Sequence, residues 1–440
     1  MSGNVLFLMA DELRFDLPGF MGNPICRTPT LDALAREAVI FDNAYTPSPV
    51  CIPARQCLAT GKYPRHIGCE YFGDDLDPGA DTWPRRFAEA GHYTVACGKL
   101  HHRGPDPMQG WLHRIGSEMA VNWPDTPANR NRTQIGRLKW RGAIELAEAG
   151  VGQSPLAAHD RYTVDGAVAF LQHFGEVRRQ QPAEEPPPVV LKVSLQQPHF
   201  PLLADRERFD YYRSRVPDRS NETAPTHPAL RLGALPCHDT VSAEEILNAT
   251  AAYYAMVEAV DSSFGRVIDA MRSVGQDPDD WTIVFTADHG EMLGEHALWA
   301  KRKFYEGSVR IPLFLRAPRQ FSGARRRENV NLVDLYPTLC ELAEIPISSD
   351  LDGRSLVPLM KGRSRDWENE TFSQFEGDQF MLKRDNLKYL CFGEWGPDVL
   401  FDLASDPSES INQIGDPEYA SRVAELRDRL DQFMAPDWHR

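Results

Sequence analysis

Four short runs of apolar residues stand out along the chain, and each has the length of a single strand. They are almost continuous in Val, Ile, Leu and Phe, and they lack the polar alternation of a strand with one exposed face. Buried strands of a parallel sheet have this pattern, so we expect the runs to form such strands. They cover residues 5–9 (VLFLM), 93–96 (YTVA), 189–195 (VVLKVSL) and 281–286 (WTIVFT).

Between these runs, apolar residues recur at the spacing of a helix, most clearly from Ser242 to about Ser273. Ser242 and Glu245 form a capping-box signature, which marks the start of a helix. Because strands alternate with helical segments, we expect an α/β fold in which a large, mostly parallel sheet is sandwiched by helices. Residues 177–188 are charged and rich in proline, which predicts an exposed loop before a strand.

The pattern changes after about residue 350. Candidate strands at 371–375, 380–383 and 388–392 lie close together, and a charged helical segment follows at about 416–433. Closely spaced short strands favour an antiparallel sheet. We therefore expect an α/β domain of residues 1–350 and a small C-terminal α+β subdomain of residues 351–440, built on an antiparallel sheet.

The charge of the chain restricts its partners. The 440 residues carry a formal net charge of −15, whereas nucleic acids and anionic membranes select proteins with basic patches. We therefore expect neither nucleic acid nor a membrane as a partner. An anionic substrate would have to be met by a local cluster of positive groups.

Cysteine usage and the N-terminal residues favour a cytoplasmic protein. The eight cysteines include no C-x-x-C pair, so neither a disulfide framework nor a structural zinc site is indicated. No stretch reaches the roughly 20 apolar residues that span a bilayer. The first residues lack a basic segment, and their apolar run stops at Asp11, unlike a secretory signal peptide.

Polar residues with catalytic potential follow each of the four apolar runs. Taken singly, a carboxylate at such a place is more often a helix N-cap, and a His is more often a loop residue. Ligands of parallel sheets bind beyond the carboxyl ends of the strands. Because polar residues follow all four predicted strands at one edge of the sheet, a ligand-binding or catalytic site is favoured there. Carboxylates and an imidazole suit a divalent metal, while Lys and His would hold an oxyanion. The residues are Asp11, Glu12, Lys99, His101, His102, His199, Asp288 and His289.

The most specific segment is 48–64 (SPVCIPARQCLATGKYP), in which Cys51, Pro53 and Arg55 form a C-x-P-x-R core. A buried cysteine at a turn is the ordinary alternative. The segment resembles the sulfatase family of the alkaline-phosphatase superfamily. In that family the motif cysteine is converted to formylglycine, and its aldehyde hydrate is the nucleophile. One hydroxyl attacks sulfur, and the other expels the sulfate by hemiacetal breakdown.

Further motifs extend the resemblance over most of the chain. Residues 98–101 (GKLH) are similar to the family's G-K-x-H element, and residues 285–290 (FTADHG) match its second metal motif. Lys301, with Glu306 and Arg310 behind it, resembles a K-x-x-x-Y/F-E-G-x-x-R-x-P element. Later segments that look like family signatures are 331–346, 352–356 and 400–412. The resemblance implies an alkaline-phosphatase-like fold.

The resemblance also implies a role for each candidate residue. One divalent metal per site, with Ca²⁺ expected and Mn²⁺ or Mg²⁺ as alternatives, would be bound by Asp11, Asp288, His289 and the modified Cys51. Glu12 stands where the family has a second Asp, or an amide in some branches. Arg55 and Lys99 would hold the sulfuryl oxygens. His101 would be the base of the second half-reaction. His199 and Lys301 would protonate or stabilise the leaving oxygen.

Departures from the family pattern point to one branch. The Asp-His pair at 288–289, where many sulfatases have Asp-Asn, is similar to choline sulfatases and phosphonate monoester hydrolases. Ile52, Ala54 and Ala59 differ from the residues most frequent around the cysteine. Of these, Ile52 and Ala59 could slow the modification of Cys51. The resemblance implies a small anionic ester as substrate and the formylglycine-generating enzyme as a maturation partner. A homo-oligomer is left open.

Two alternatives to a sulfate monoesterase are kept. The same machinery could act on a phosphonate monoester or a phosphodiester, because pocket charge beyond the core motif decides between these anions. A protein of the same fold could also bind without catalysis, although the complete set of polar residues argues against this. Trp111, Trp123 and Trp140 are expected in the core, with a π face for a cationic or aromatic leaving group as the second interpretation.

Overall fold

The computed structural model describes residues 3–102, 104–116, 142–180, 187–231, 240–348 and 350–435. Within them, the centre of the molecule is a nine-stranded sheet in the order β11-β2-β10-β8-β1-β6-β3-β4, with β9 paired to β2. The strands are β1 (Val5–Asp11), β2 (Val39–Tyr45), β3 (Tyr93–Gly98), β4 (His113–Ile115), β6 (Val189–Pro198), β8 (Thr282–Ala287), β9 (Arg310–Ile311), β10 (Leu313–Arg316) and β11 (Ala324–Asn331).

β1 lies in the middle of this sheet, and all seven of its residues are buried. It runs parallel to β6 on one side, where Val5 pairs with Val190, and parallel to β8 on the other, where Val5 pairs with Thr282. β3 continues the parallel order beyond β6. The four apolar runs therefore form four neighbouring parallel strands, as predicted, and their carboxyl ends share one edge of the sheet.

The other half of the sheet is mixed. β10 runs antiparallel to both β8 and β2, while β11 is parallel to β2. The sheet is thus mostly parallel, as the alternation of strands and helices predicts. β11 has the sequence ARRRENVN, which carries no apolar run, and it forms a strand because it pairs along the edge of β2.

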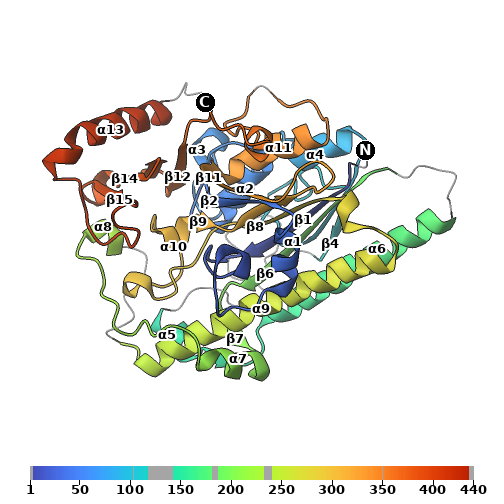
Figure 1. Ribbon diagram of the computed structural model, residues 1–440, viewed down its shortest axis with the longest axis horizontal. Helices are drawn as coiled ribbons and strands as arrows, with labels where there is room; N and C mark the ends of the chain where they lie inside the picture. Colours follow the sequence, from blue (N-terminus) through green and yellow to red (C-terminus); the bar gives the residue numbers. More distant parts are fainter. Residues whose placement is uncertain are drawn as a thin grey trace.

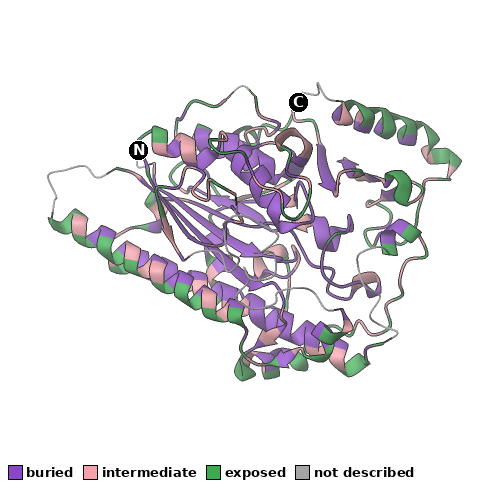
Figure 2. Ribbon diagram, turned by 180° about the vertical axis from the view of Figure 1, so that it is seen from behind, coloured by how far each residue is buried: buried purple, intermediate pink, exposed green. Residues whose placement is uncertain are grey.

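Helices cover both faces of the sheet (Figure 1). The long helices α6 and α9 lie along one face, and α2, α4 and α11 lie on the other. Their inward sides are buried and their outward sides are exposed, as Figure 2 shows for the two long helices. The bounds are α2 (Cys51–Thr60), α4 (Trp83–Glu89), α6 (Pro155–Gln180), α9 (Ala243–Ser273) and α11 (Leu335–Leu342).

The start of α9 confirms the predicted capping box. Ser242 Oγ accepts the N–H of Glu245 at 3.3 Å, and Glu245 Oε2 accepts the N–H of Ser242 at 2.7 Å. The end of α6 corrects the loop predicted for 177–188, because the helix continues to Gln180. Arg and Gln are good helix formers, and Glu176 stabilises this last turn by accepting hydrogen bonds from Arg179 and Gln180.

The C-terminal region contains the predicted antiparallel sheet, in the order β12-β13-β14-β15. A helix, α13, packs on it, and Phe433 of that helix stacks on Phe372 with ring centroids 4.1 Å apart. β15 was not among the predicted strands, and the domain boundary at residue 350 stays a prediction. The elements are β12 (Glu370–Phe375), β13 (Gln379–Arg384), β14 (Leu387–Cys391), β15 (Val399–Asp402) and α13 (Ala420–Met434).

A buried ion cluster joins this sheet to the main one. Lys388 Nζ lies 2.6 Å from both Glu306 Oε1 and Glu409 Oε1, and it donates a hydrogen bond to the carbonyl of Phe304 at 2.9 Å. All three charged side chains are buried. Phe304 and Glu306 follow Lys301 closely, so the segment behind that lysine is anchored to the C-terminal sheet.

The remaining elements are short and lie mainly in connections. No helix in the described parts of the chain has the length and apolar character needed to cross a membrane. These elements are α1 (Pro29–Ala35), α3 (Pro64–Ile67), α5 (Ala143–Ala147), α7 (Arg206–Arg213), α8 (Pro228–Arg231), α10 (Glu306–Val309), α12 (Val357–Met360), β5 (Gly150–Val151), β7 (Leu203–Ala204), η1 (Gly19–Met21), η2 (Pro278–Asp280), η3 (Glu295–Ala297), η4 (Leu332–Asp334), η5 (Gly393–Trp395) and η6 (Pro417–Tyr419).

Candidate active site

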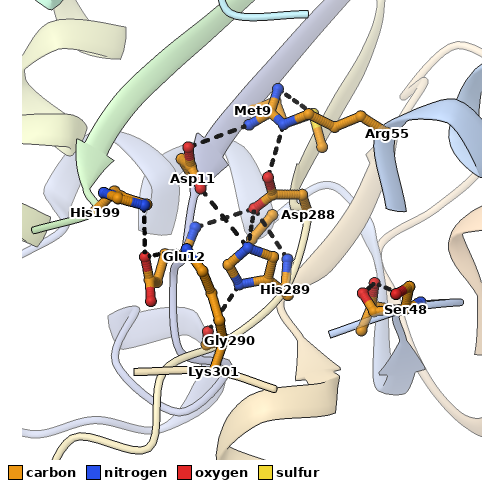
Figure 3. A network of polar contacts seen from close by, with 12 residues as sticks. Met9, Asp11, Glu12, Ser48, Arg55, His199, Asp288, His289, Gly290 and Lys301 are labelled. Atoms are coloured by element: carbon orange, nitrogen blue, oxygen red, sulfur yellow. Dashed lines mark hydrogen bonds and ion pairs between the residues drawn. The ribbon is translucent and has the colours of Figure 1, made fainter. Parts of the chain in front are cut away.

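The carboxyl ends of β1 and β8 bring four acidic and imidazole side chains together (Figure 3). Asp288 Oδ1 accepts the backbone N–H of Glu12 and of His289, each at 3.0 Å, and so ties the two strand ends to each other. Glu12 has a φ of 62°, a left-handed conformation that is uncommon outside glycine. Strained residues of this kind cluster at functional sites, and here the strain turns the Glu12 carboxylate into the cluster.

Arg55, on the helix that begins with Cys51, holds this cluster from one side. Its Nε donates to Asp288 Oδ2 at 2.7 Å, and its Nη1 donates to the carbonyl of Lys99 and to Ser194 Oγ, both at 2.9 Å. Burial opposes ionisation of Asp288, but Arg55, His289 and Lys99 nevertheless hold the pKa of its carboxyl well below the usual value. Asp288 is therefore a carboxylate with a fixed orientation.

Two lysines pair with the carboxylates of β1. Lys99 forms an ion pair with Asp11, and Lys301 Nζ lies 2.7 Å from Glu12 Oε2. Burial acts to lower the pKa of Lys301, but Glu12 and Cys51 outweigh it and raise that pKa above its ordinary value. Burial raises the pKa of Glu12 well above the usual range, and Lys301 only partly opposes this. Lys301 therefore stays a cation inside the site.

His199 approaches Glu12 from the end of β6. Its Nε2 lies 3.3 Å from Glu12 Oε2, and its Nδ1 lies 2.8 Å from the carbonyl of Phe200. Burial, together with Lys301 and Lys99, lowers the pKa of His199 well below its ordinary value. The imidazole is thus neutral at neutral pH, which leaves Lys301 as the positive group on this side of the cluster.

Cys51 is the first residue of α2 and is 2% exposed. Its Sγ lies within 4.8 Å of a ligand atom of Asp288 and of His289. Burial raises the pKa of the Cys51 thiol to about 11, although Lys301 and Arg55 oppose the shift. In the environment formed by the neighbouring side chains, the unmodified Cys51 thiol is protonated at neutral pH and is therefore a poor nucleophile.

The cluster has the donor atoms of a divalent metal site. Asp11 Oδ1, Glu12 Oε1 and His289 Nε2 are buried and have no hydrogen-bond partner among the described residues. His289 Nε2 lies 3.8 Å from Asp11 Oδ1 and from Asp288 Oδ1, and burial lowers the pKa of His289 to about 3. A neutral imidazole among carboxylate oxygens suits a hard or borderline divalent cation, so these residues fit such an ion.

His101 follows β3, three residues after its last residue, Gly98. Its φ is 61°, and its carbonyl accepts a hydrogen bond from Gln56 at 2.7 Å. Its ring meets that of Phe72 edge-on, with centroids 6.3 Å apart, and Phe72 is 50% exposed. His102 is buried instead against Gln56, at 2.9 Å, and burial lowers its pKa well below normal. His102 therefore adds no positive charge, contrary to its expected part in the cationic cluster.

Two glycines allow the backbone to come close at the site. A Cβ on Gly290 would lie 2.0 Å from the carbonyl oxygen of Gly307, and the Gly290 N–H donates to the carbonyl of Ser308 at 2.8 Å. Gly98 has a φ of 85°, and a Cβ there would lie 2.3 Å from the carbonyl oxygen of Ser194. The glycines of the GKLH and DHG segments are therefore required by contact with neighbouring backbone.

Several residues of the site were not found by sequence reasoning. Ser194 holds Arg55, Gln56 contacts both His101 and His102, and Asp160 of α6 accepts the N–H groups of Gln196 and Gln197 at 2.7 and 2.9 Å. Ser194 and Asp160 lie in a strand and a helix with no local signal of function, and Gln56 lies in the segment 48–64 but outside its C-x-P-x-R core. Only the tertiary contact between α6 and the end of β6 reveals the part of Asp160.

Of the three tryptophans considered above, Trp111 belongs to the core. It is 3% exposed, and its ring packs edge-on against Trp83 with centroids 5.1 Å apart. Trp123 and Trp140 lie outside the described residues. Among the described residues near His101, Phe72 is the exposed aromatic side chain. The roles assigned to the site residues stay predictions. The contacts described above join nine of these side chains: Asp11, Glu12, Cys51, Arg55, Lys99, His199, Asp288, His289 and Lys301.

Comparisons with known proteins agree with this geometry. Residues 3–345 match the sulfatase family model, and residues 294–435 match the model of the N-sulphoglucosamine sulphohydrolase C-terminal region. A choline-sulfatase of Rhizobium meliloti is 30% identical over 434 residues, covering 94% of this chain and 83% of the relative. An arylsulfatase of Clostridium perfringens is 28% identical over 462 residues, covering 97% of this chain and 93% of the relative.

Solved structures share the fold. A phosphonate monoester hydrolase of Agrobacterium radiobacter superposes with a TM-score of 0.77 at 23% identity, covering 97% of this chain and 94% of that one. The sulfatase family model spans most of the chain, and the choline-sulfatase relative supports the branch indicated by the Asp-His pair. The chain therefore belongs to the sulfatase family and is a sulfuric ester hydrolase.

Proposed function

We propose that this protein hydrolyses a small sulfate monoester in a metal-dependent reaction, with the nucleophile supplied by position 51 after conversion of Cys51 to formylglycine. One observation carries the proposal. Cys51 lies in the same buried cluster as Asp288 and His289, with Arg55 and Lys301 close enough to act on its thiol. A nucleophile beside both metal-binding groups and fixed cations is the arrangement that attack on an anionic ester requires.

The metal would be held by Asp11, Glu12, Asp288 and His289, with position 51 completing the set. When bound, the ion would act as a Lewis acid and as a template for the sulfuryl group. Oxygen donors with one imidazole favour Ca²⁺, with Mn²⁺ or Mg²⁺ as alternatives. Glu12 is longer than the Asp common at this place, and its Oε1 accepts no hydrogen bond from the described residues, which leaves that oxygen available to an ion.

The cations of the site would bind the sulfuryl oxygens. Arg55 is held by three acceptors, so its guanidinium cannot turn away, and Lys99 is fixed against Asp11. Charges that are already oriented stabilise developing negative charge without reorganisation during the reaction. This accounts for an overall acidic protein that accepts an anionic substrate.

The two halves of the reaction would use different groups. In the first, a hydroxyl of the hydrated aldehyde at position 51 would form a bond to sulfur as the bond between sulfur and the ester oxygen breaks, and the Lys301 ammonium would give that oxygen its proton as the alcohol leaves. Lys301 would stabilise this oxygen, with His199 beside it. In the second half, His101 would accept the proton of the other hydroxyl, the carbon–oxygen bond to the sulfate would break to leave the aldehyde, and water would add to that aldehyde.

The organic half of the substrate would lie toward Phe72. This ring is half-exposed and contacts the ring of His101, so it offers an apolar face at the edge of the site. A small aryl or alkyl group could pack there. A phosphonate monoester or phosphodiester would meet the same cations, which is why the substrate test includes them.

The test begins with position 51. Protein made with the modifying enzyme should yield a peptide in which the Cys51 sulfur is replaced by oxygen and two hydrogens are lost. Cys51→Ala should lose nearly all turnover, whereas Cys57→Ala, which changes another buried cysteine of α2, should keep it. The rates of hydrolysis of a nitrophenyl sulfate, a nitrophenyl phosphonate and a nitrophenyl phosphodiester are then compared. Full activity of Cys51→Ala would refute the assignment of position 51 as the nucleophile. A preference for the phosphonate or the phosphodiester would show that the substrate is a phosphorus ester and not a sulfate ester.

A further inference from the structure

Glu291, next to the DHG segment, has no part in the proposed reaction although its carboxylate is buried. It is 6% exposed and begins a loop that returns to the site at Lys301. Its Oε1 accepts the backbone N–H of Leu293 at 3.0 Å and of Ala300 at 2.5 Å. One carboxylate oxygen therefore joins the beginning and the end of this loop.

The backbone closes the same junction. Met292 donates its N–H to the carbonyl of Ala300 at 2.8 Å. Leu293 and Ala300 have φ values of 49° and 63°, so both donors to Glu291 are non-glycine residues in the left-handed conformation. Such residues are strained and persist only where surrounding contacts hold them. The Glu291 carboxylate is the side chain that supplies those contacts.

The residue after Ala300 is Lys301. Its Nζ lies 2.7 Å from Glu12 Oε2, and its ammonium is 5.7 Å from the centre of the Phe200 ring. The direction of a lysine side chain depends on the backbone that carries it. A change in φ at Ala300 would therefore move the ammonium away from Glu12 and from the leaving-group side of the site.

We propose that Glu291 is a positioning residue for Lys301, which fixes the backbone of Ala300 and thereby holds the Lys301 ammonium at the leaving oxygen. This inference rests on the proposed function, in which Lys301 stabilises that oxygen. Glu291 itself does not touch the substrate in this arrangement. Its Oε1 is occupied by two N–H donors, and Glu291 is not in either group of potential metal ligands among the described residues. Its carboxyl group also interacts with that of Glu12, so the metal bound by each variant is measured to separate this contact from the effect on Lys301.

The test compares leaving groups. A misplacement of about 1 Å in a catalytic group costs on the order of 10²-fold in rate. We therefore expect Glu291→Ala to lower kcat for phenyl sulfate by about that factor, and to lower it far less for a dinitrophenyl sulfate, whose phenolate leaves without help. Glu291→Gln keeps an acceptor oxygen and should retain more of the rate than Glu291→Ala.

Double variants separate positioning from a general structural role. If Glu291 acts through Lys301, the variant with both Glu291→Ala and Lys301→Ala is no slower than Lys301→Ala alone, because coupled residues are not additive. Glu295→Gln is the matched control. It changes the same loop where Glu295 binds Arg14, at 2.8 Å, and it should show no dependence on the leaving group.

Three results would overturn the inference: equal slowing of all leaving groups by Glu291→Ala, full additivity with Lys301→Ala, or the same leaving-group dependence in Glu295→Gln. If Glu291→Ala does not fold, Glu291→Asp withdraws the acceptor by one methylene and should show the same selective loss. Melting temperature and bound metal are measured for each variant. A Lys301→Ala enzyme without leaving-group dependence would instead refute the role of Lys301 in the proposed function.

Discussion

Arg55→Lys should weaken metal binding even though the site keeps its positive charge. Arg55 reaches three acceptors at once: Asp288 Oδ2 at 2.7 Å, and the Lys99 carbonyl and Ser194 Oγ at 2.9 Å. A lysine carries a single nitrogen in place of the three of the guanidinium and cannot replace this fork. The substitution keeps the positive charge for a reason. Removing a cation next to the site would by itself strengthen binding of the metal ion, and this gain would mask the weaker binding caused by a misoriented Asp288.

The magnitude follows from the bond that orients Asp288. A hydrogen bond to a charged group contributes about 1.5–3 kcal/mol, and each 1.4 kcal/mol is about tenfold in an equilibrium constant. We therefore expect the metal dissociation constant to rise about 10- to 100-fold, which is the range found for residues that orient metal ligands. Ser194→Ala removes one neutral partner of Arg55 and leaves its bond to Asp288, so it should change the constant by less than about threefold.

Titration against a competing chelator measures both variants with Ca²⁺ and with Mn²⁺. The melting temperature without metal shows whether either variant has lost its fold. The reasoning would be refuted if Arg55→Lys bound the ion within threefold of the parent protein. It would also be refuted if Ser194→Ala weakened binding as much as Arg55→Lys, since the bond to Asp288 would then not be the deciding contact.

Three further predictions concern the reaction and the fold. Chelation should abolish activity, and Ca²⁺, Mn²⁺ or Mg²⁺ should restore it; an unchanged rate after complete removal of metal would contradict the site. In rapid-quench experiments, His101→Ala should release about one equivalent of alcohol per site and then stall with the sulfate retained on the protein, whereas His199→Ala should show no burst with a poor leaving group; the opposite result would exchange their roles. Lys388→Met should destabilise the fold by about 3–5 kcal/mol in urea unfolding at pH 8, because two buried carboxylates lose their cation. Burial raises the pKa of Glu409 to about 7, so this carboxyl is protonated below that pH in the fold and the loss should be smaller at pH 6, which an equal loss at both pH values would contradict.

Strand and motif positions could be predicted because their signals are local. Residues 5–9 contain only apolar side chains, and such a run is stable only in the middle of a sheet. Once these runs are parallel neighbours, the residues that follow them must meet at one edge, which is how Asp11 and Asp288 come together. The capping box at Ser242 is equally local, since both partners lie within one turn.

Two of the parts that could not be predicted depend on contacts between distant segments, and a third depends on a contact within one turn of a helix. β11 contains three consecutive arginines and becomes a strand through its pairing with β2. His102 was expected to carry charge, but burial, together with the positive charge of Arg114 and Lys192, lowers its pKa and keeps it neutral. The loop predicted for 177–188 begins instead with the last turn of α6, in which Arg179 and Gln180 pair with Glu176. For β11 and His102, the residues that decide the outcome come from distant parts of the chain. For the end of α6, the deciding residue is Glu176, one turn away, and the charged composition of the segment hides this contact.

The close approach of Gly290 and Gly307 has a consequence for how this enzyme could be altered. The two glycines belong to separate motifs, one next to His289 and the other six residues after Lys301, and their backbones touch with no room for a Cβ. Inserting or deleting residues between them would lengthen or shorten the intervening loop without changing the distance between its ends. The two ends of the loop are therefore held at one fixed separation, whereas Lys301, which lies between them, depends on the contacts that Glu291 makes inside the loop. Redesign for a larger or differently shaped ester is better directed at the open edge around Phe72, where side chains can change without moving this junction.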